Sequence, residues 1–507
     1  MRIFCLVILS SLFTLNVASQ EWENSKHFGG DGNYRIHEVE VDNNNIYVAG
    51  LLSGTNDTIT SHGSFDVFLA KLDNELNLEW FKQIGGELFD DLYFDITVHK
   101  DIVYFLLGAQ DTVYFAKDDT LISDGSHDVF LASYLSDGNV NYIKKIAGSS
   151  TAQRATSLDI DNNEDIIVGG FYTDSITFEN DTIVSSGTNQ YLGKFDIDGN
   201  YIWSKNIPGT NSRTRLTSIN AYSDGYYIDG YFVDSLLFDI ETITSTSSDV
   251  SDLFLYKTDY NGDGIWVRRG YGNGNDVTGS ITKDDYGNIY YTGYFNSDTL
   301  TIDYDENIIA QDTLFNKGDF DIFINKYNRE GNLQWTKAYQ SPNREYAVDI
   351  AQNYGNLYIG GYYTDSIAFG NDTLISPFVD DRNMFVSIFD LEGNHLKANH
   401  ILGSDNGADY IDGIALSKAN HSYLGGYFKS SSLYVGDSTY TNSNTNALDG
   451  LVVEYFAPLS AAFTDQQNVS CPGSDNGMLV VKPYFGVPPY EYSWSHTDTL
   501  ASDTATN

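Results

Sequence analysis

Cysteine is almost absent from this sequence. Among 507 residues there are only two, Cys5 and Cys471. Cys5 lies in an N-terminal stretch that we expect to be removed, so the mature chain keeps one cysteine and cannot form an intrachain disulfide. Its stability must therefore come from the burial of a large core.

Basic residues are also scarce. Lys and Arg number 28 against 70 Asp and Glu, which gives a net charge of −42. Such a chain repels polyphosphates, so no nucleic-acid partner is expected. The acidic residues are scattered through turn-like segments and not gathered into a tail, which indicates a solvated surface.

Long apolar runs are missing after residue 20. No later run reaches the roughly 20 residues that span a bilayer, so no transmembrane segment is predicted. The first twenty residues combine Arg2, an apolar run over residues 3–15 and the small residues Val17-Ala18-Ser19. This pattern is typical of a secretory signal peptide over residues 1–19. We therefore expect an exported protein that begins at Gln20.

Known catalytic motifs are also missing. The sequence has no Gly-x-Ser-x-Gly elbow and no His-Glu-x-x-His pair, and its nine histidines are scattered. Acidic pairs such as Asp90-Asp91 and Asp380-Asp381 are typical of solvated turns in a chain this acidic. The sequence therefore predicts a protein that is not an enzyme.

What the sequence does contain is a long repeat. Its fullest copy, over residues 356–366, reads Asn-Leu-Tyr-Ile-Gly-Gly-Tyr-Tyr-Thr-Asp-Ser, and seven copies align on one glycine. Successive copies lie 58 to 68 residues apart, which is typical of repeat architectures. The aligned glycines are Gly50, Gly108, Gly170, Gly230, Gly293, Gly361 and Gly426.

Each repeat unit predicts four strands. An alternating run such as residues 346–351 leads through a turn into the glycine-aromatic strand, and period-two alternation indicates half-buried strands. A polar hairpin, a third strand such as residues 252–257 and a Gly-Asn turn precede a strand headed by tryptophan, as at Trp203. Four short antiparallel strands make one propeller blade. We therefore predict an all-β, seven-bladed β-propeller over residues 20–458.

The two ends of the repeat region predict that the ring is closed. The seventh copy stops at Pro458 without its tryptophan-headed strand, and residues 22–30 supply a spare copy that matches residues 80–86 in its Lys and Gly-Gly. The first strand should therefore complete the last blade and remove two exposed sheet edges. The sixth copy carries Lys397 where tryptophan is expected, so we expect that blade to pack less well.

These repeats resemble a known group. The Gly-Gly-Tyr-Phe, Asp-Ser-Ile, Phe-Leu-Ala-Lys and Trp-x-Lys elements are similar to the SBBP-type β-propeller repeats of secreted bacterial proteins. The resemblance covers residues 20–458. It implies the propeller fold and a bacterial, extracellular location, and it implies no particular function.

The last segment, residues 459–507, breaks the period. A Cys at position 471, an Asp-Asn-Gly turn and a Gly-x-Pro-Pro-Tyr-x-Tyr-x-Trp strand ending at Trp494 resemble a SprB-type repeat, a β-sandwich module of gliding-motility and surface adhesins. The family module continues to a second cysteine that is not present here. We therefore expect an incomplete module within a longer multidomain chain, of the kind exported by type IX secretion.

One segment predicts a calcium site. Asp259, Asn261 and Asp263, followed by Gly264, reproduce the first half of a calcium loop, with oxygen ligands at alternate positions. The twelfth position, where a bidentate Glu belongs, is Gly270, so the segment is not an EF-hand. The same location in other repeats is a plain Gly-Asn hairpin turn, which is therefore the default interpretation of these residues.

The aromatic pairs that follow the repeated glycines have two interpretations. Pairs such as Tyr362-Tyr363 and Tyr427-Phe428 could pack between blades, because aromatic side chains dominate core burial, or could line a surface on which sugars stack. Core packing between blades is the simpler interpretation of regularly spaced pairs, and sugar stacking is the alternative.

Taken together, these patterns predict an exported, non-enzymatic propeller. We expect a monomeric interaction or adhesion module of a bacterial cell surface, or a secreted one, whose partner is a surface glycan or a protein. The alternative is an extracellular propeller enzyme that acts on polysaccharide, because a propeller can gather catalytic residues from several blades at its channel mouth.

Overall fold

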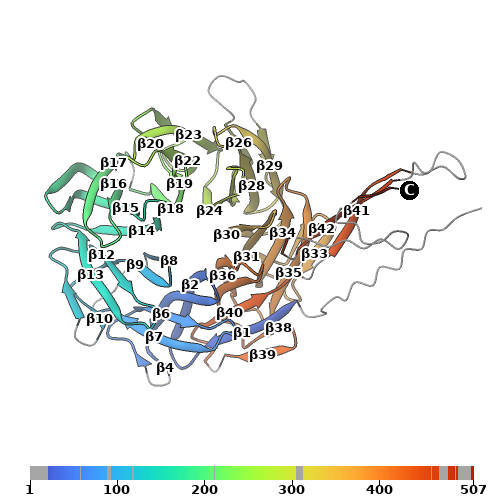
Figure 1. Cartoon of the computed structure of the whole chain (residues 1–507), viewed down its shortest axis with the longest axis horizontal. Coiled ribbons are helices and arrows are strands. Elements are labelled where there is room, and N and C mark those ends of the chain that lie inside the picture. Colours follow the sequence, from blue (N-terminus) through green and yellow to red (C-terminus); the bar gives the residue numbers. More distant parts are fainter. Residues whose placement is uncertain are drawn as a thin grey trace, which may run out of the picture.

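The computed structural model shows a ring of β-sheets around a central axis (Figure 1). It describes residues 21–56, 59–87, 93–116, 119–210, 212–303, 312–442, 444–457, 460–467, 478–485, 487–488 and 504–506. Every regular element within these ranges is a β-strand, and none of them is a helix that could cross a membrane. The all-β fold predicted from the repeat is confirmed.

Seven four-stranded antiparallel sheets form the blades of the propeller. The first strand of each blade lies innermost, because these seven strands contact one another around the axis. In order along the ring, each from the inside outwards, the blades are β2 (Asn33–Asp42), β3 (Asn45–Ser53), β6 (Asp66–Leu72) and β7 (Leu78–Ile84); β8 (Phe94–His99), β9 (Ile102–Ala109), β12 (Asp128–Tyr134) and β13 (Val140–Ala147); β14 (Gln153–Ile160), β15 (Ile166–Phe178), β16 (Asp181–Phe195) and β17 (Tyr201–Ile207); β18 (Arg215–Tyr222), β19 (Gly225–Phe232), β22 (Asp252–Thr258) and β23 (Gly264–Tyr271); β24 (Asp276–Lys283), β25 (Ile289–Phe295), β28 (Asp321–Tyr327) and β29 (Leu333–Tyr339); β30 (Glu345–Asn353), β31 (Asn356–Thr364), β34 (Arg382–Asp390) and β35 (His395–Gly403); and β36 (Tyr410–Leu416), β37 (Ser422–Phe428), β40 (Asp449–Tyr455) and β1 (Trp22–Phe28).

A short hairpin follows the second strand of most blades and corresponds to the polar hairpin of the repeat. In the third blade this hairpin is continuous with β15 and β16. The hairpins of the other blades are β4 (Thr55–Asn56) with β5 (Ile59–Thr60), β10 (Thr112–Ala116) with β11 (Asp119–Ile122), β20 (Ser235–Leu237) with β21 (Thr242–Thr244), β26 (Thr299–Ile302) with β27 (Asp312–Phe315), β32 (Ser366–Phe369) with β33 (Asp372–Ile375), and β38 (Ser432–Val435) with β39 (Ser438–Thr441). Two of them also pair with the outer strand of the preceding blade, β26 with β23 and β38 with β35.

The ring closes through the first strand of the chain. β1 pairs antiparallel with β40, and Ser25 and Lys26 lie opposite Val453 and Val452. The register shifts between Trp22 and Ser25, so that Trp22 lies opposite Tyr455. This pairing covers the outer edge of β40, which would otherwise offer unpaired backbone groups to other chains. The predicted closure is confirmed.

The repeated glycine allows a bulge in the inner strand. A Cβ on Gly361 would lie 1.9 Å from the carbonyl oxygen of Tyr346, and the register of β30 against β31 shifts at this point, between Ala347 and Asp349. A side chain at Gly361 would therefore collide with backbone that cannot move away. A bulge bends the strand and re-aims the side chain of its extra residue, which here is Val348.

The Gly-Asn turn and the Trp-x-Lys strand form one contact between neighbouring blades. Gly262, which has a φ of +75°, packs on the Trp203 indole of the preceding blade, and its Cβ would lie 2.7 Å from the ring. A glycine is thus required both by the left-handed backbone and by the space. The same contact joins Trp80 to Gly138, Trp266 to Gly331 and Trp335 to Gly393.

The sixth blade departs from this contact at Lys397. No turn links β40 to β1, so the seventh blade has no glycine for a tryptophan to cover. Instead Lys397 forms an ion pair with Glu21, and the side chain of Asn399 donates to the same carboxylate. The substitution therefore fits the break in the chain at this point of the ring.

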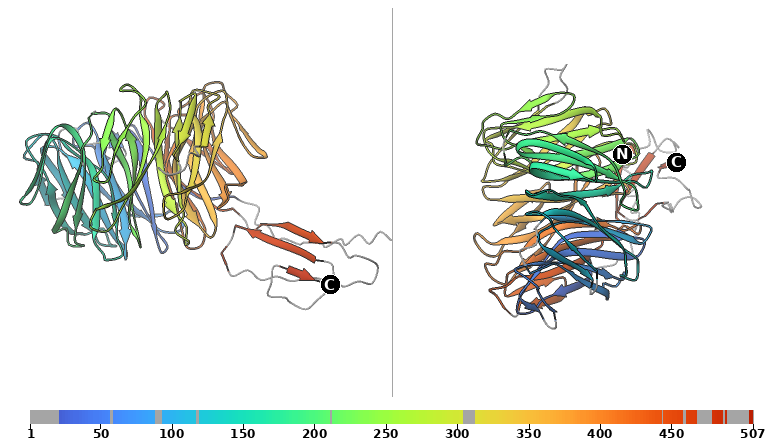
Figure 2. Two further views of the ribbon diagram at one scale, coloured as in Figure 1. Left: turned by 90° about the horizontal axis from the view of Figure 1, so that it is seen from above. Right: turned by 90° about the vertical axis from the view of Figure 1, so that its left-hand side faces the viewer.

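The last described segments form a separate three-stranded sheet, which projects from the ring (Figure 2). It contains β41 (Ser460–Gln467), β42 (Met478–Tyr484) and β43 (Thr504–Thr506). The Lys482 amine lies 3.8 Å from the Asp390 carboxylate of the sixth blade. Cys471, like the acidic pair Asp90-Asp91, lies outside the described residues. The boundary at residue 459 stays a prediction.

Candidate functional site at the channel mouth

The predicted calcium residues lie in the turn between β22 and β23. The Asp259 carboxylate accepts hydrogen bonds from the backbone amides of Asn261 and Asp263, at 2.8 and 3.0 Å, which fixes the turn. Asp263 in turn lies 2.8 Å from the Lys205 amine of the preceding blade. The same pattern recurs at Asp196, whose carboxylate caps the equivalent turn. Calcium binding by Asp259, Asn261 and Asp263 stays a prediction.

The aromatic pairs are split between two environments. The second member of each pair is buried between blades, as Tyr363 and Phe428 show, whereas the first members Tyr362 and Tyr427 are half-buried and turn to the opposite face of the strand. Alternation along a strand separates neighbours in this way. The core interpretation is therefore correct for the second member of each pair, whereas sugar stacking on the first member stays a prediction.

The first member of each aromatic pair lies opposite a residue at the start of the innermost strand of its blade. Tyr362 lies opposite Tyr346, and Tyr427 lies opposite Tyr410. The Tyr346 and Tyr362 rings stack with centroids 4.6 Å apart, Tyr362 meets Tyr410 edge-on at 4.7 Å, and Tyr410 lies 4.9 Å from Tyr427. Together with Tyr294, which lies 4.6 Å from Tyr346, these residues form what we call the tyrosine belt. It runs across the fifth, sixth and seventh blades.

Arginines continue the belt around the rest of the mouth. Arg154 and Arg215 take the positions that Tyr346 and Tyr410 hold in the later blades, and the Arg215 guanidinium lies 4.1 Å from the centre of the Phe171 ring. Arg35 lies 5.8 Å from the centre of Tyr427 and joins the first blade to the belt. Six of the ten arginines in the sequence lie at or beside the starts of the first or third strands on this rim, namely Arg35, Arg154, Arg213, Arg215, Arg344 and Arg382.

The tyrosine hydroxyls of the belt are available as hydrogen-bond donors. Burial raises the pKa of Tyr346, Tyr362 and Tyr427 above the ordinary tyrosine value, so their hydroxyls stay protonated at neutral pH. Each of these hydroxyls can therefore donate a hydrogen bond, and each guanidinium offers N–H donors. The mouth thus combines flat apolar rings with several fixed donors.

Acidic side chains lie deeper in the channel. Asp95 accepts a hydrogen bond from the Leu158 amide of the next blade at 2.8 Å, and Asp349 accepts one from the Ile414 amide at 2.8 Å. Burial raises the pKa of Asp95 to about 7 and that of Asp349 to about 6. Since these bonds join inner strands of neighbouring blades, the carboxylates connect the blades around the axis.

A histidine and an aspartate meet where the seventh blade adjoins the first. His37 and Asp412 occupy the bulges of β2 and β36, and His37 Nδ1 lies 2.8 Å from Asp412 Oδ2. The His37 ring also lies 5.8 Å from Tyr427 of the belt. Neither this pair nor the belt arginines was predicted from the sequence. Their shared position at the start of the first strand of a unit was the available signal.

Parts of the chain are similar to known proteins. The SprB repeat family model matches residues 463–499. Over 222 residues the chain is 24% identical to an uncharacterized WD repeat-containing protein of Acanthamoeba polyphaga mimivirus, a match that covers 37% of this chain and 16% of that protein. The chain thus spans a small part of the length of this relative.

Two solved structures show a distant likeness in fold. The lignostilbene dioxygenase of Pseudomonas brassicacearum has a TM-score of 0.38 at 8% identity, over 85% of this chain and 91% of that one. A mutant of the Synechocystis apocarotenoid oxygenase has a TM-score of 0.36 at 9% identity, over 84% and 95%. Scores this low carry no argument about function.

Proposed function

We propose that this chain is an exported, non-enzymatic β-propeller that acts as an interaction or adhesion module, on a bacterial cell surface or secreted from it. The observation that carries the proposal is the channel mouth, where the tyrosine belt meets Arg35 of the first blade and further arginines follow in the third and fourth blades. The SprB repeat match at residues 463–499 supports it, because adhesion-type surface proteins contain this module. The resemblance to SBBP repeats and the predicted signal peptide support export.

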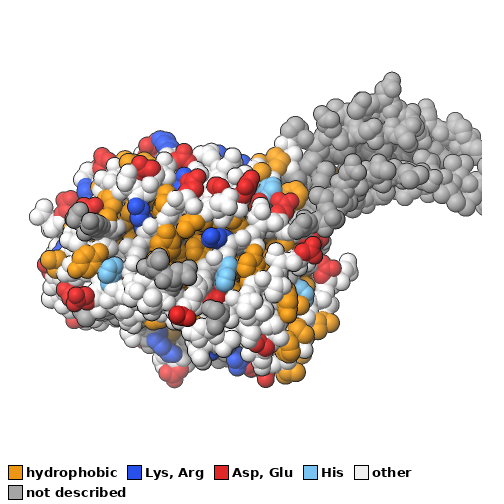
Figure 3. Space-filling view, turned by 90° about the horizontal axis from the view of Figure 1, so that it is seen from below, with side chains coloured by type: hydrophobic (Ala, Val, Ile, Leu, Met, Phe, Trp, Pro, Cys, Tyr) orange, Lys and Arg blue, Asp and Glu red, His pale blue; other side chains and the backbone are white. Residues whose placement is uncertain are grey.

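The chemistry of the mouth favours an acidic glycan as the ligand. Flat tyrosine rings offer stacking surfaces to the apolar faces of sugars, and guanidinium groups bind carboxylates through paired hydrogen bonds. Arginine is scarce in a chain with a net charge of −42, yet it gathers at this rim. On the outer side of the propeller shown in Figure 3, by contrast, acidic and basic side chains are interspersed.

Glycan-array binding of the full chain tests this proposal. We expect binding to glycans that carry uronic acid or sialic acid, and a loss of at least tenfold in affinity for Arg215→Gln and for Tyr410→Ala. Arg268→Gln serves as the control, because Arg268 lies on the outer strand β23 and contacts the Gly331 turn of the next blade. Equal binding by all three variants, or no binding by the wild-type chain, would overturn the proposal.

The alternative function is that of an extracellular enzyme acting on polysaccharide. His37 and Asp412 at the mouth, with Asp95 deeper in the channel and its pKa raised to about 7, are the groups that favour it. General acid–base catalysis needs a group whose pKa lies near the pH at which the enzyme works. Release of reducing ends from an acidic polysaccharide, lost in Asp412→Asn, would replace the first proposal with this one.

A further inference from the structure

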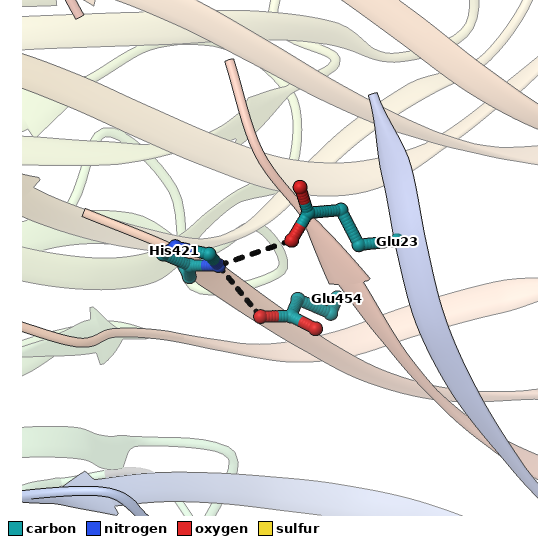
Figure 4. Close-up of side chains that lie close together, drawn as sticks. All are labelled: Glu23, His421 and Glu454. Carbon is teal, nitrogen blue, oxygen red and sulfur yellow. Dashed lines mark hydrogen bonds and ion pairs between the residues drawn. The ribbon is translucent and has the colours of Figure 1, made fainter. Parts of the chain in front are cut away.

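We propose that Glu23, His421 and Glu454 form a binding site for a divalent transition-metal ion of the zinc type, which locks the closing strand to the last blade. His421 Nδ1 lies 2.6 Å from Glu454 Oε1 and 3.5 Å from Glu23 Oε2. One ligand atom from each residue lies within 4.8 Å of the other two. Figure 4 shows all three side chains pointing to one place.

Ring closure brings Glu23 to the other two residues, which meet through the pairing of β37 with β40. Glu23 lies on β1, Glu454 lies on β40, and His421 immediately precedes β37. About four hundred residues of chain separate Glu23 from the other two. An ion held by all three would therefore link the start of the propeller to its end.

Comparison with the other blades shows that this position is unusual. At the place of Glu454 the first, third, fourth and fifth blades carry a lysine, and in the third blade Lys194 lies 3.0 Å from Asp165, which takes the place of His421. The seventh blade exchanges the acidic and basic members of this pair. Glu23 takes the place that Glu79 holds in the first blade, where Glu79 lies 2.8 Å from Lys71. The exchange therefore leaves two carboxylates and an imidazole together, which is a donor set for a cation.

The surroundings hold the ligands in place. The Glu454 side chain is 3% exposed, and Asn24 and Tyr423 donate hydrogen bonds to it at 2.5 and 3.1 Å. The His421 ring packs on Phe456, with centroids 4.7 Å apart. Hydrogen bonds of this kind hold ligating carboxylates in place in metal sites, and their loss lowers the affinity for the metal about 10- to 100-fold.

The ligand set suits a small N/O-binding ion. Zinc takes imidazole nitrogen and carboxylate oxygen at about 2.0–2.2 Å in a tetrahedron, which places ligand atoms roughly 3.3–3.6 Å apart. The distances of 2.6 and 3.5 Å in this cluster need only small side-chain shifts to meet that geometry. Glu23 is 32% exposed, which gives an ion access from solvent and leaves room for a water as fourth ligand. Binding displaces the proton that His421 shares with Glu454.

Calorimetric titration of the full chain with Zn²⁺ tests the site. We expect one ion per chain, and an affinity at least tenfold lower in Glu23→Gln and in His421→Asn. Asparagine is tolerated at this place in the repeat, because Asn288 occupies it in the fifth blade. His27→Asn is the control, since His27 also bridges β1 and β40 through Asp449, at 2.8 Å, but with one carboxylate only.

A second measurement separates a specific site from the general attraction of cations to an acidic chain. Zn²⁺ should slow hydrogen–deuterium exchange of the β1 amides in the wild-type chain and in His27→Asn, and should leave exchange in His421→Asn unchanged. The proposal fails if Zn²⁺ does not bind, or if Glu23→Gln and His421→Asn bind it as tightly as the wild-type chain.

Discussion

Lys397 of the sixth blade forms an ion pair with Glu21, the residue just before the closing strand. In the other blades with a tryptophan at this position, the indole covers a turn glycine of the following blade, as Trp335 covers Gly393. The seventh blade has no such turn, because its last strand comes from the other end of the chain. The repeat thus changes its residues where its connectivity changes.

Exchanging the charges of Glu21 and Lys397 should change the free energy of unfolding little. Lys397→Glu should lower the free energy of unfolding by about 1 kcal/mol, because the pair is partly exposed and such pairs are worth roughly 0.2–1 kcal/mol. The double variant Glu21→Lys, Lys397→Glu should recover most of that loss. Urea unfolding of the wild-type chain, of Lys397→Glu, of Glu21→Lys and of the double variant gives the coupling energy. A coupling of zero would show that the ion pair does not help to hold the N-terminus.

Removal of the closing strand should damage the ring far more. A chain without residues 21–28 leaves β40 as an exposed edge strand and removes Trp22 and Phe28 from the core. We expect aggregation, seen by size-exclusion chromatography, because open sheet edges pair with other chains. A synthetic peptide of residues 20–30, added in excess, should restore the monomer. A truncated chain that stays monomeric without the peptide would contradict this account of closure.

Replacement of a repeat glycine should show how tightly the bulge is packed. Gly361→Ala places a methyl group 1.9 Å from the Tyr346 carbonyl oxygen, so we expect a loss of at least about 3 kcal/mol or failure to fold. Gly355→Ala is the matched control, because Gly355 has a φ of +79° but open space around it. Its cost should be about 1 kcal/mol, from backbone strain alone. Thermal unfolding measures both.

The pH dependence of stability should reveal a buried acid pair between the fifth and sixth blades. Burial, and then repulsion by Asp321, raise the pKa of Glu345 well above its usual range. Folding therefore takes up a proton, and the stability gained is fully present below the unfolded pKa of about 4.3 and is lost as pH rises through the folded pKa.

Glu345→Gln should remove this dependence. At pH 9 the variant should be more stable than the wild-type chain by at least about 1.4 kcal/mol, the free energy of one pKa unit, and at pH 5 the two should differ little. Gln153 occupies the same place in the third blade and is fully buried there, so glutamine fits the site. Melting temperatures at the two pH values give the comparison. A variant that is less stable at pH 9 would show that Glu345 is ionised in the fold.

Calcium binding by the turn of Asp259, Asn261 and Asp263 has a direct test. Bound calcium would screen the Asp263 carboxylate from Lys205 and would add stability that a chelator removes. If the site binds calcium, chelation should lower the melting temperature by a few degrees in the wild-type chain and not in Asp259→Ser. Asp196→Ser, in the equivalent turn of the third blade, is the control. If chelation changes the melting temperature of all three chains equally, the segment forms a turn and does not bind calcium.

The sequence by itself determined the number of blades, their four strands and the closure of the ring. A period of about sixty residues, strands that alternate every second residue, and a spare strand at the N-terminus each have one physical solution, because sheets must bury one face and cover their edges. Lys397 was visible as a departure from the repeat, but its partner Glu21 was not.

Only the tertiary structure decided which side chains meet at the channel mouth and at the seam. Alternation shows that Tyr362 and Tyr363 face opposite ways, but it does not show which of them faces the mouth, because that depends on how the sheets turn about the axis. In the same way Glu23, His421 and Glu454 carry no common pattern in the sequence. They meet because a closed ring brings the first strand of the chain beside the last, whatever the length of chain between them.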